Sequence, residues 1–254
     1  MIRLKTKEDI ERLKIGGNKL SEVLQETAKL IKPGILTSDL NDFAHKKIIE
    51  LGGKPSFLNY STTGVSRPYP ASLCVCLNDE IVHGIPNEDP KNINDGDIVT
   101  IDAGLIYDGL FTDSALTVIV GDVPKEAKEL VKRTREALQA AIKVCRVGNH
   151  IGDIGAAVQK IGQKSGFSVV EGLTGHGVGY AVHEDPYVPN EGQAGKGELI
   201  EEGLVIAIEP MFSLGGSEIL LDKDGWTYKT RDGSLSAQFE HTIAVTKDGP
   251  VVLT

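Results

Sequence analysis

Apolar and polar positions in the first fifty residues repeat with a helical period. The pattern predicts a first helix that begins after Thr6, which can cap it with Asp9 at the capping-box position, and that ends by Pro33-Gly34. A second helical pattern begins near Thr37 and stops at Gly52-Gly53. The chain is therefore expected to open with two consecutive helices.

The same order of elements is predicted twice. After the first two helices, apolar runs predict strands at Ser72–Leu77, Ile98–Tyr107 and Leu110–Val120. Two more helices are predicted from Pro124 to near Gly148 and at Ile151–Ser165. Further strands are expected at Phe167–Val170, Leu204–Phe212, Trp226–Thr230, Ala237–Val245 and Pro250–Leu253. This repeated order predicts an α+β fold in one domain, 1–254, with related halves of roughly 1–121 and 122–254 that share a sheet.

A two-residue turn at Asp108-Gly109 is expected to join two of these strands in a hairpin. If the residues that flank the turn pair with each other, Asp102 lies opposite Ala115. Asp113 then lies opposite Gly104, and both acids share one face of the sheet because the side-chain period is two. The diagonal spacing of about 7–8 Å suits two carboxylates that hold a pair of ions, and the two small partners are expected to leave room for them.

Three further metal-type ligands stand in apolar or glycine-rich strings: His176, Glu209 and Glu240. Burying acids costs several kcal/mol unless charge or hydrogen bonds compensate, so four converging carboxylates predict two divalent cations. One imidazole among four carboxylates favours Co, Fe, Mn or Zn over Ca or Mg. Two alternatives stay open: Asp102 on a solvated strand face, and Gly175–Gly179 as a flexible or phosphate-binding loop, although it matches no Walker pattern.

Composition narrows the class of protein. A net charge of −9 over 254 residues disfavours a specific nucleic-acid binder, and 40% hydrophobic residues suffice for a sizeable core. Three cysteines make no disulfide framework. The charged stretch 1–11 has no apolar signal-peptide core, and no apolar run is long enough to span a membrane. A cytoplasmic enzyme with no membrane partner is therefore expected.

Two histidines have unusual neighbours. His83 precedes Gly84-Ile85-Pro86, and His183 precedes Glu184-Asp185-Pro186. Either could be an ordinary loop residue when considered alone. Beside a metal site, however, each becomes a candidate acid–base group or oxyanion donor.

Taken in order, these strings resemble the methionine aminopeptidases, which belong to the wider pita-bread fold family. The resemblance covers essentially the whole chain and is carried by Asn78–Pro86, Thr174–Gly177, Ile208–Met211 and Ser234–Thr242. The interval between His176 and Glu209 has no room for the insertion of type II enzymes, so the chain resembles type I. Because no N-terminal zinc-finger extension is visible, the resemblance is to bacterial enzymes. It implies two pseudo-symmetric helix-helix-strand halves around a curved antiparallel sheet.

The resemblance also implies roles for the five ligands. Asp102 would hold one ion and His176 the other, while Asp113 and Glu240 would bridge the pair. Glu209 would bind the second ion and act as the proton shuttle for a nucleophilic water.

Further residues would bind the substrate. His183 would contact the scissile carbonyl, and His83 the peptide nitrogen beyond the cleaved bond. Tyr69, Cys74 and Trp226 would form the methionine pocket. The sequence departs from the family pattern at Val182 and at Ser66, where aromatic residues are expected, and in the lengthened segment 60–68. These departures affect the walls of the pocket.

The function implied is metal-dependent removal of the initiator methionine from the N-termini of nascent polypeptides whose second residue is small. The ribosome near the exit tunnel is a further candidate partner, and a monomer is expected. Two alternatives remain: an X-Pro dipeptidase or aminopeptidase on the same fold, and a non-catalytic pita-bread binding module. Such modules lose metal ligands, whereas this chain retains all five.

Overall fold

The computed structural model describes residues 1–254 and contains four helices. They are α1 (Lys7–Leu30), α2 (Thr37–Glu50), α3 (Lys125–Val144) and α4 (Ile151–Ser165). All four predicted helices are confirmed, and at the start of α1 the Thr6 side chain accepts a hydrogen bond from the Asp9 backbone in the predicted capping box. None of these helices has the length and hydrophobicity that a membrane crossing requires.

A nine-stranded antiparallel sheet runs through the middle of the molecule. Its strands are β1 (Lys54–Pro55), β2 (Cys74–Leu77), β4 (Ile98–Tyr107), β5 (Leu110–Ile119), β7 (Thr174–Gly177), β8 (Glu184–Pro189), β9 (Val205–Ile208), β14 (Glu240–Thr246) and β15 (Gly249–Val252). Their order is β1-β4-β5-β14-β9-β7-β8, with β2 paired to β4 and β15 paired to β14. Strands from both halves of the chain thus share one sheet, as the repeated order of elements predicted.

Two three-stranded sheets complete the fold. One contains β6 (Ser168–Val169), β10 (Met211–Ser213) and β13 (Ser236–Gln238); the other contains β3 (Glu80–Val82), β11 (Ile219–Leu221) and β12 (Tyr228–Thr230). The single strands predicted at 204–212 and 237–245 are therefore each divided in two. Pro210 has no N–H to donate, so the ladder is interrupted there. The register nevertheless continues, since Ile208 lies opposite His241 and Met211 opposite Gln238.

Five strands were not predicted: β1, β3, β7, β8 and β11. The most instructive is β7, because its glycine-rich string was expected to form a loop. A Cβ at Gly175 would lie 2.4 Å from the Ala207 carbonyl oxygen, and one at Gly177 would lie 2.2 Å from that of Asp185. The glycines therefore allow neighbouring backbones to approach closely rather than making the segment flexible.

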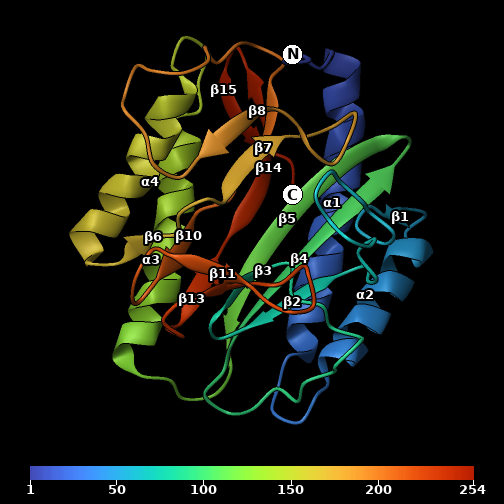
Figure 1. Cartoon of the computed structure of the whole chain (residues 1–254). Helices are drawn as coiled ribbons and strands as arrows, with labels where there is room; N and C mark the ends of the chain where they lie inside the picture. The colour runs from blue at the N-terminus through green and yellow to red at the C-terminus, as the bar shows by residue number, and fades with distance from the viewer.

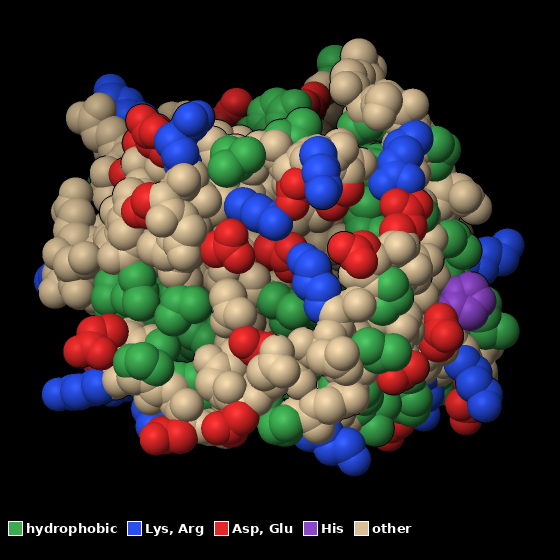
Figure 2. Space-filling view, turned by 60° about the horizontal axis from the view of Figure 1, so that its bottom comes forward, with side chains coloured by type: hydrophobic (Ala, Val, Ile, Leu, Met, Phe, Trp, Pro, Cys, Tyr) green, Lys and Arg blue, Asp and Glu red, His purple; other side chains and the backbone are tan.

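Each half of the chain has its own hydrophobic core. In Figure 1, α1 and α2 lie at the right of the view and α3 and α4 at the left. Leu20, Leu24 and Leu40 from the first pair of helices belong to a cluster with residues of β2 and β4. Leu130 and Ile154 from the second pair belong to a separate, larger cluster with residues of β9 and β14. On the face shown in Figure 2, acidic and basic side chains are intermixed.

Threonine and serine hydroxyls help to join the two halves where β5 meets β14. Only two residue pairs form the ladder between these strands. The Thr242 hydroxyl accepts from Asp113 N (2.9 Å) and donates to Asp113 O (2.8 Å). The Thr117 hydroxyl bridges N and O of Gln238 in the same way. These side chains satisfy backbone groups that the short ladder leaves without partners.

Candidate metal centre and substrate pocket

The predicted hairpin places two acids on one face of the sheet. Asp102 lies opposite Ala115 and Asp113 opposite Gly104, as the turn predicted. Asp102 is only 8% exposed, which rules out a solvated strand face. The expectation that Gly104 leaves room for ions was wrong, since a Cβ there would lie 1.9 Å from the Ser56 hydroxyl oxygen. The space above Gly104 is filled by protein.

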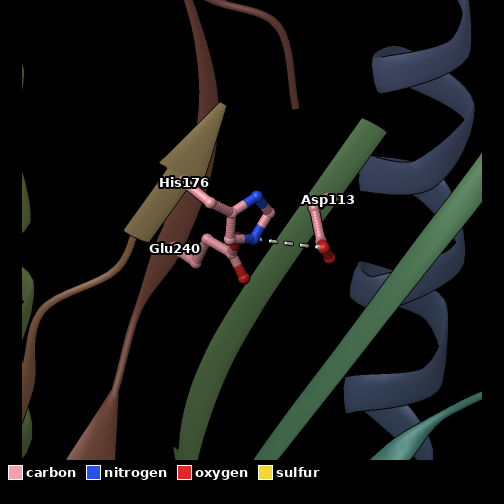
Figure 3. A group of neighbouring side chains, drawn as sticks. All are labelled: Asp113, His176 and Glu240. Atoms are coloured by element: carbon pink, nitrogen blue, oxygen red, sulfur yellow. Dashed lines mark ion pairs between the residues drawn. The ribbon is translucent and has the colours of Figure 1, made fainter. Parts of the chain in front are cut away.

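The remaining candidate ligands reach the same place from the second half. His176 lies on β7, Glu209 directly follows β9, and Glu240 is the first residue of β14. Figure 3 shows the side chains of His176 and Glu240 pointing toward Asp113. His176 Nε2 lies 3.6 Å from Glu209 Oε1 and 3.9 Å from Asp113 Oδ2. Ligand atoms of Asp113, His176 and Glu240 all lie within 4.8 Å of one another.

The acids of this cluster are buried without a compensating positive charge. Burial raises the pKa of Asp102 to about 7 and the pKa values of Asp113, Glu209 and Glu240 well above their usual range. No lysine or arginine lines the pocket around them. Asp102 Oδ1 and Glu240 Oε1 are buried and have no hydrogen-bond partner. Such unpaired acidic oxygens are the donor atoms that divalent cations bind.

His176 is prepared to act as a ligand through Nε2. Its Nδ1 lies 2.9 Å from the Gly177 carbonyl oxygen, an acceptor, so Nδ1 carries the proton. Burial lowers the pKa of His176 to about 3, which keeps the ring neutral. The lone pair of Nε2 then faces the carboxylates, an arrangement that is common among metal-binding histidines. The donor set therefore fits a divalent metal.

A pocket of about 460 Å³ adjoins these carboxylates. All ten residues singled out from the sequence line it: His83, Asp102, Asp113, His176, His183, Glu209, Glu240, Tyr69, Cys74 and Trp226. Both histidines for which an ordinary loop position was the alternative therefore lie in the pocket beside the carboxylates. His241 directly follows Glu240 in the strand and therefore points to the other face of the sheet, where its ring contacts Thr254.

The side chain of His183 is oriented by a tyrosine. Tyr60 Oη lies 2.7 Å from His183 Nδ1. Burial raises the pKa of Tyr60, so its hydroxyl keeps its proton and donates to Nδ1. The other ring nitrogen, Nε2, then carries the ring proton. His83 has φ of +59°, and its pKa is lowered to about 4 by burial and by the repulsion that protonated His183 would exert on a protonated His83 ring.

Another part of the pocket lining is aromatic and apolar. The rings of Tyr69 and Trp226 meet edge to face, with centroids 5.3 Å apart, and Cys74 is buried beside them. The Tyr69 hydroxyl contacts the Gly84 carbonyl oxygen at 2.9 Å and Trp226 Nε1 donates to the Arg67 carbonyl oxygen. Because both polar ends are satisfied, the rings present apolar surface to the pocket.

Several contributors to the site were not predicted. Tyr60 and Thr62 reach the pocket from the lengthened segment, and Gln238 Nε2 donates to Glu209 Oε2 at 3.1 Å. Asn190 Nδ2 donates to the Glu209 carbonyl oxygen at 3.0 Å. Gln238 could have been inferred because it lies two residues before Glu240 and therefore shares its face of the sheet. Nothing in the local sequence marks Tyr60 or Asn190, because their partners are distant in the chain.

The sequence model of metallopeptidase family M24 matches residues 11–247. The chain belongs to this family. An M24 peptidase uses divalent metal, in agreement with the unpaired carboxylate oxygens. The methionine aminopeptidase of Aquifex aeolicus is 46% identical over 100% of this chain and 98% of its own length.

The fold of this M24 peptidase is the pita-bread fold. The crystal structure of the methionine aminopeptidase of Thermotoga maritima has a TM-score of 0.95 and 41% identity, covering 100% of this chain and 99% of that one. The prolidase of Pyrococcus furiosus is 21% identical with a TM-score of 0.76. That likeness shows the fold alone, and the present chain spans only 65% of the prolidase.

Proposed function

We propose that this M24 peptidase is a methionyl aminopeptidase, which removes the initiator methionine from nascent polypeptides when the second residue is small. The observation that carries the proposal is one pocket whose lining combines two kinds of side chain. Buried carboxylates and histidines line it together with a thiol and aromatic rings. Sulfur and aromatic groups make favourable contacts with a thioether, so this part of the lining suits a methionine side chain.

Five side chains would hold the metal. Asp102, Asp113, His176, Glu209 and Glu240 would together hold two divalent ions. Bound divalent ions polarise carbonyl groups and lower the pKa of water toward neutrality. The presence of one imidazole favours Co, Fe, Mn or Zn.

Glu209 would move the proton during hydrolysis. Its Oε2 accepts a hydrogen bond from Gln238, and its backbone carbonyl is held by Asn190, so the carboxylate has a fixed orientation. In this role, Glu209 takes a proton from the attacking water and delivers it to the leaving amine nitrogen. Two carboxylate oxygens allow Glu209 to remain hydrogen-bonded while it carries the proton.

His183 and His83 would act on the substrate directly. With Tyr60 donating to Nδ1, the Nε2–H of His183 is free to donate to the scissile carbonyl oxygen as negative charge develops. The pKa of His183 is lowered by burial, so the ring donates as neutral imidazole. His83 lies in the same pocket and would bind the peptide nitrogen beyond the cleaved bond.

Other features of the proposal concern the protein as a whole. We propose that residues 1–254 form one catalytic domain of two halves, 1–121 and 122–254, and that the protein acts as a monomer in the cytoplasm. The ribosome near the exit tunnel is the proposed further partner. The non-catalytic alternative is disfavoured because every candidate ligand is present and faces the pocket.

A direct assay tests the proposed function. Metal-free protein should be mixed with Met-Ala-Ser or with an X-Pro dipeptide, without metal and then with Co, Mn, Fe or Zn in turn. We expect release of methionine only with metal, and no cleavage of X-Pro. Among Met-X-Ser peptides, Gly, Ala and Ser should be cleaved fast, Val more slowly, and Leu and Ile little. Preferential cleavage of X-Pro would contradict the proposal.

A further inference from the structure

The backbone of the loop that carries His183 is held by hydrogen bonds to the side chain of the next residue, Glu184. This loop, residues 178–183, joins β7 to β8. Glu184 Oε1 accepts hydrogen bonds from the backbone N–H groups of both Tyr180 and Ala181, the latter at 2.8 Å. One carboxylate oxygen thus fixes two amides of the loop immediately beside His183.

The other oxygen of the same carboxylate binds a residue from the far end of the chain. Lys5 Nζ lies 2.7 Å from Glu184 Oε2, and the two side chains are 1% and 8% exposed. Burying an ammonium and a carboxylate removes both from water, so this pair depends on good geometry and additional hydrogen bonds. Those bonds are present, because Lys5 Nζ also donates to the Arg3 carbonyl oxygen and Glu184 accepts the two loop amides.

The Lys5 side chain lies against the loop itself. A Cβ on Gly179 would come within 2.5 Å of Lys5 Cε, so only glycine fits beneath the side chain, and its φ of +133° also favours glycine. The backbone of Lys5 is fixed in turn, since its N–H donates to the Gly203 carbonyl oxygen at 2.7 Å. Lys5 is therefore anchored at both its backbone and its ammonium group.

The N-terminal segment contacts the loop at a second point, the side chain of Tyr180. The Tyr180 hydroxyl donates to Asp9 Oδ2 at 2.7 Å, and Asp9 belongs to the capping box of α1. The Arg3 guanidinium lies 4.2 Å from the centroid of the Tyr180 ring. Residues 3–9 thus connect the loop beside the pocket to the rigid start of a helix.

We propose that Lys5 is a positioning residue: through its buried ion pair with Glu184, it fixes the loop that presents His183 to the substrate. The inference rests on the proposed role of His183 as donor to the scissile carbonyl. Lys5 does not line the pocket, so its effect on the reaction passes through Glu184 and the loop. Displacement of such a donor by about 1 Å can cost on the order of 100-fold in rate.

The test compares Lys5→Met with Lys47→Met. Lys47 pairs with Glu22 (2.8 Å) and Glu26 on the helices of the first half, and its side chain is 14% exposed, so it controls for the loss of an ion pair elsewhere. In metal-loaded enzyme, Lys5→Met should lower kcat for Met-Ala-Ser by about 10- to 100-fold with little change in KM. It should also speed hydrogen exchange at the Tyr180 and Ala181 amides. Lys47→Met should do neither, and Lys5→Arg should recover part of the loss.

A double-mutant cycle shows whether Lys5 acts through His183. In the His183→Ala background, Lys5→Met should cause almost no further loss of kcat; a fully additive loss would overturn the proposal. If His183→Ala alone leaves kcat normal, the proposed role of His183 fails, and the amide exchange then decides the loop-fixing step by itself. Unchanged exchange in Lys5→Met would overturn that step.

If Lys5→Met does not fold, Glu184→Gln serves instead. Glutamine keeps an acceptor for the two amides and removes the charge that pairs with Lys5. We then expect slower turnover and faster exchange at Tyr180 and Ala181, with bound metal unchanged. Normal kcat and exchange in Glu184→Gln would overturn the proposal.

Discussion

The two halves of the molecule present their candidate ligands in different ways. In the first half, Asp102 and Asp113 lie within a regular ladder of ten residue pairs between β4 and β5. In the second half, no ligand lies inside a long strand. His176 is on four-residue β7, Glu209 falls in the gap between β9 and β10, and Glu240 begins β14.

The difference shows two ways of fixing a side chain. A regular ladder fixes direction through the strand period, so Asp102 and Asp113 need few special supports. At the end of a strand the ladder no longer fixes the side chain, and amide side chains supply the missing bonds. Gln238 and Asn190 both hold Glu209 in this manner. The second half should consequently depend more on individual hydrogen bonds.

The largest effect is expected for Glu209→Gln. The variant removes both the proton carrier and one ligand charge, so kcat should fall by about 10²–10⁴-fold while the circular dichroism spectrum stays unchanged. Metal content and turnover of Met-Ala-Ser should be measured together. The matched first-half variant is Asp102→Asn, which should lose bound metal. Turnover close to that of the unchanged enzyme in Glu209→Gln would refute the assigned role.

His183→Ala should act on the reaction and not on the metal. A single oxyanion donor contributes about 10²–10³-fold to kcat, so a loss of this size is expected with metal content unchanged. Elemental analysis beside steady-state kinetics separates the two. Loss of metal from the variant would show that His183 is a ligand, and the division of the histidines would be wrong.

Metal should stabilise the protein in a pH-dependent manner. Unfolded carboxyls ionise near pH 4, whereas burial raises the pKa of Asp102 to about 7 and that of Glu209 well above its usual range. Between about pH 4 and pH 7 these acids therefore bind more protons in the metal-free folded state than in the unfolded state, and their contribution to stability falls as the pH rises. His176 is already neutral there, since burial lowers its pKa to about 3.

Since bound cations require deprotonated carboxylates, the metal-induced rise in Tm should grow between about pH 5.5 and about pH 7.5. At a fixed metal concentration, equal to 100 times the Kd at pH 7.5, the rise at that pH should be about 5–10 °C. Thermal scans with and without metal measure it. An increment that does not change with pH would argue against proton release from these acids.

Tyr60→Phe should have a smaller effect. It removes the donor to His183 Nδ1 but keeps the ring, so kcat should fall by about tenfold, equivalent to about 1.4 kcal/mol. The ring tautomer of His183 should become mixed, which nitrogen NMR of the imidazole would detect. Unchanged kcat together with a single unchanged tautomer would show that Tyr60 does not orient His183.

The smallest effect on turnover is expected at the junction of the halves, where the change is in stability. Thr242→Val keeps the shape but leaves Asp113 N and O without the hydroxyl, so the free energy of unfolding should fall by about 1–3 kcal/mol. Thr100→Val is the matched control within the hairpin, since Thr117 keeps its bonds to Gln238. Urea unfolding of both measures the difference. Equal losses would show that the junction is no more sensitive than the hairpin.

Local chemistry made much of the fold predictable. The Asp108-Gly109 turn gave the register of β4 and β5, and that register alone placed Asp102 and Asp113 on one face. The capping residues of α1 and Gly166 after α4 bounded their helices correctly. In each case the signal and its effect lie within a few residues of each other.

Contacts between distant segments could not be predicted in the same way. β7 was mistaken for a loop because its glycines are required by the close approach of the Ala207 and Asp185 backbones. The local sequence of β7 does not reveal that approach. The strand interruptions at Pro210 and Phe239 moved Glu209 and Glu240 to strand ends. A periodic pattern cannot reveal such features, because it describes only the preferences of one segment.

The sequence by itself determined the helices, the central hairpin, the family and the set of candidate ligand residues. Only the tertiary structure decided which groups support them: Tyr60 on His183, Gln238 on Glu209, and Lys5 on Glu184. Helix caps, turns and strand periods act over a few residues, so the local sequence is enough to predict them. A buried hydrogen bond between segments far apart in the chain exists only once the whole sheet and both cores have assembled.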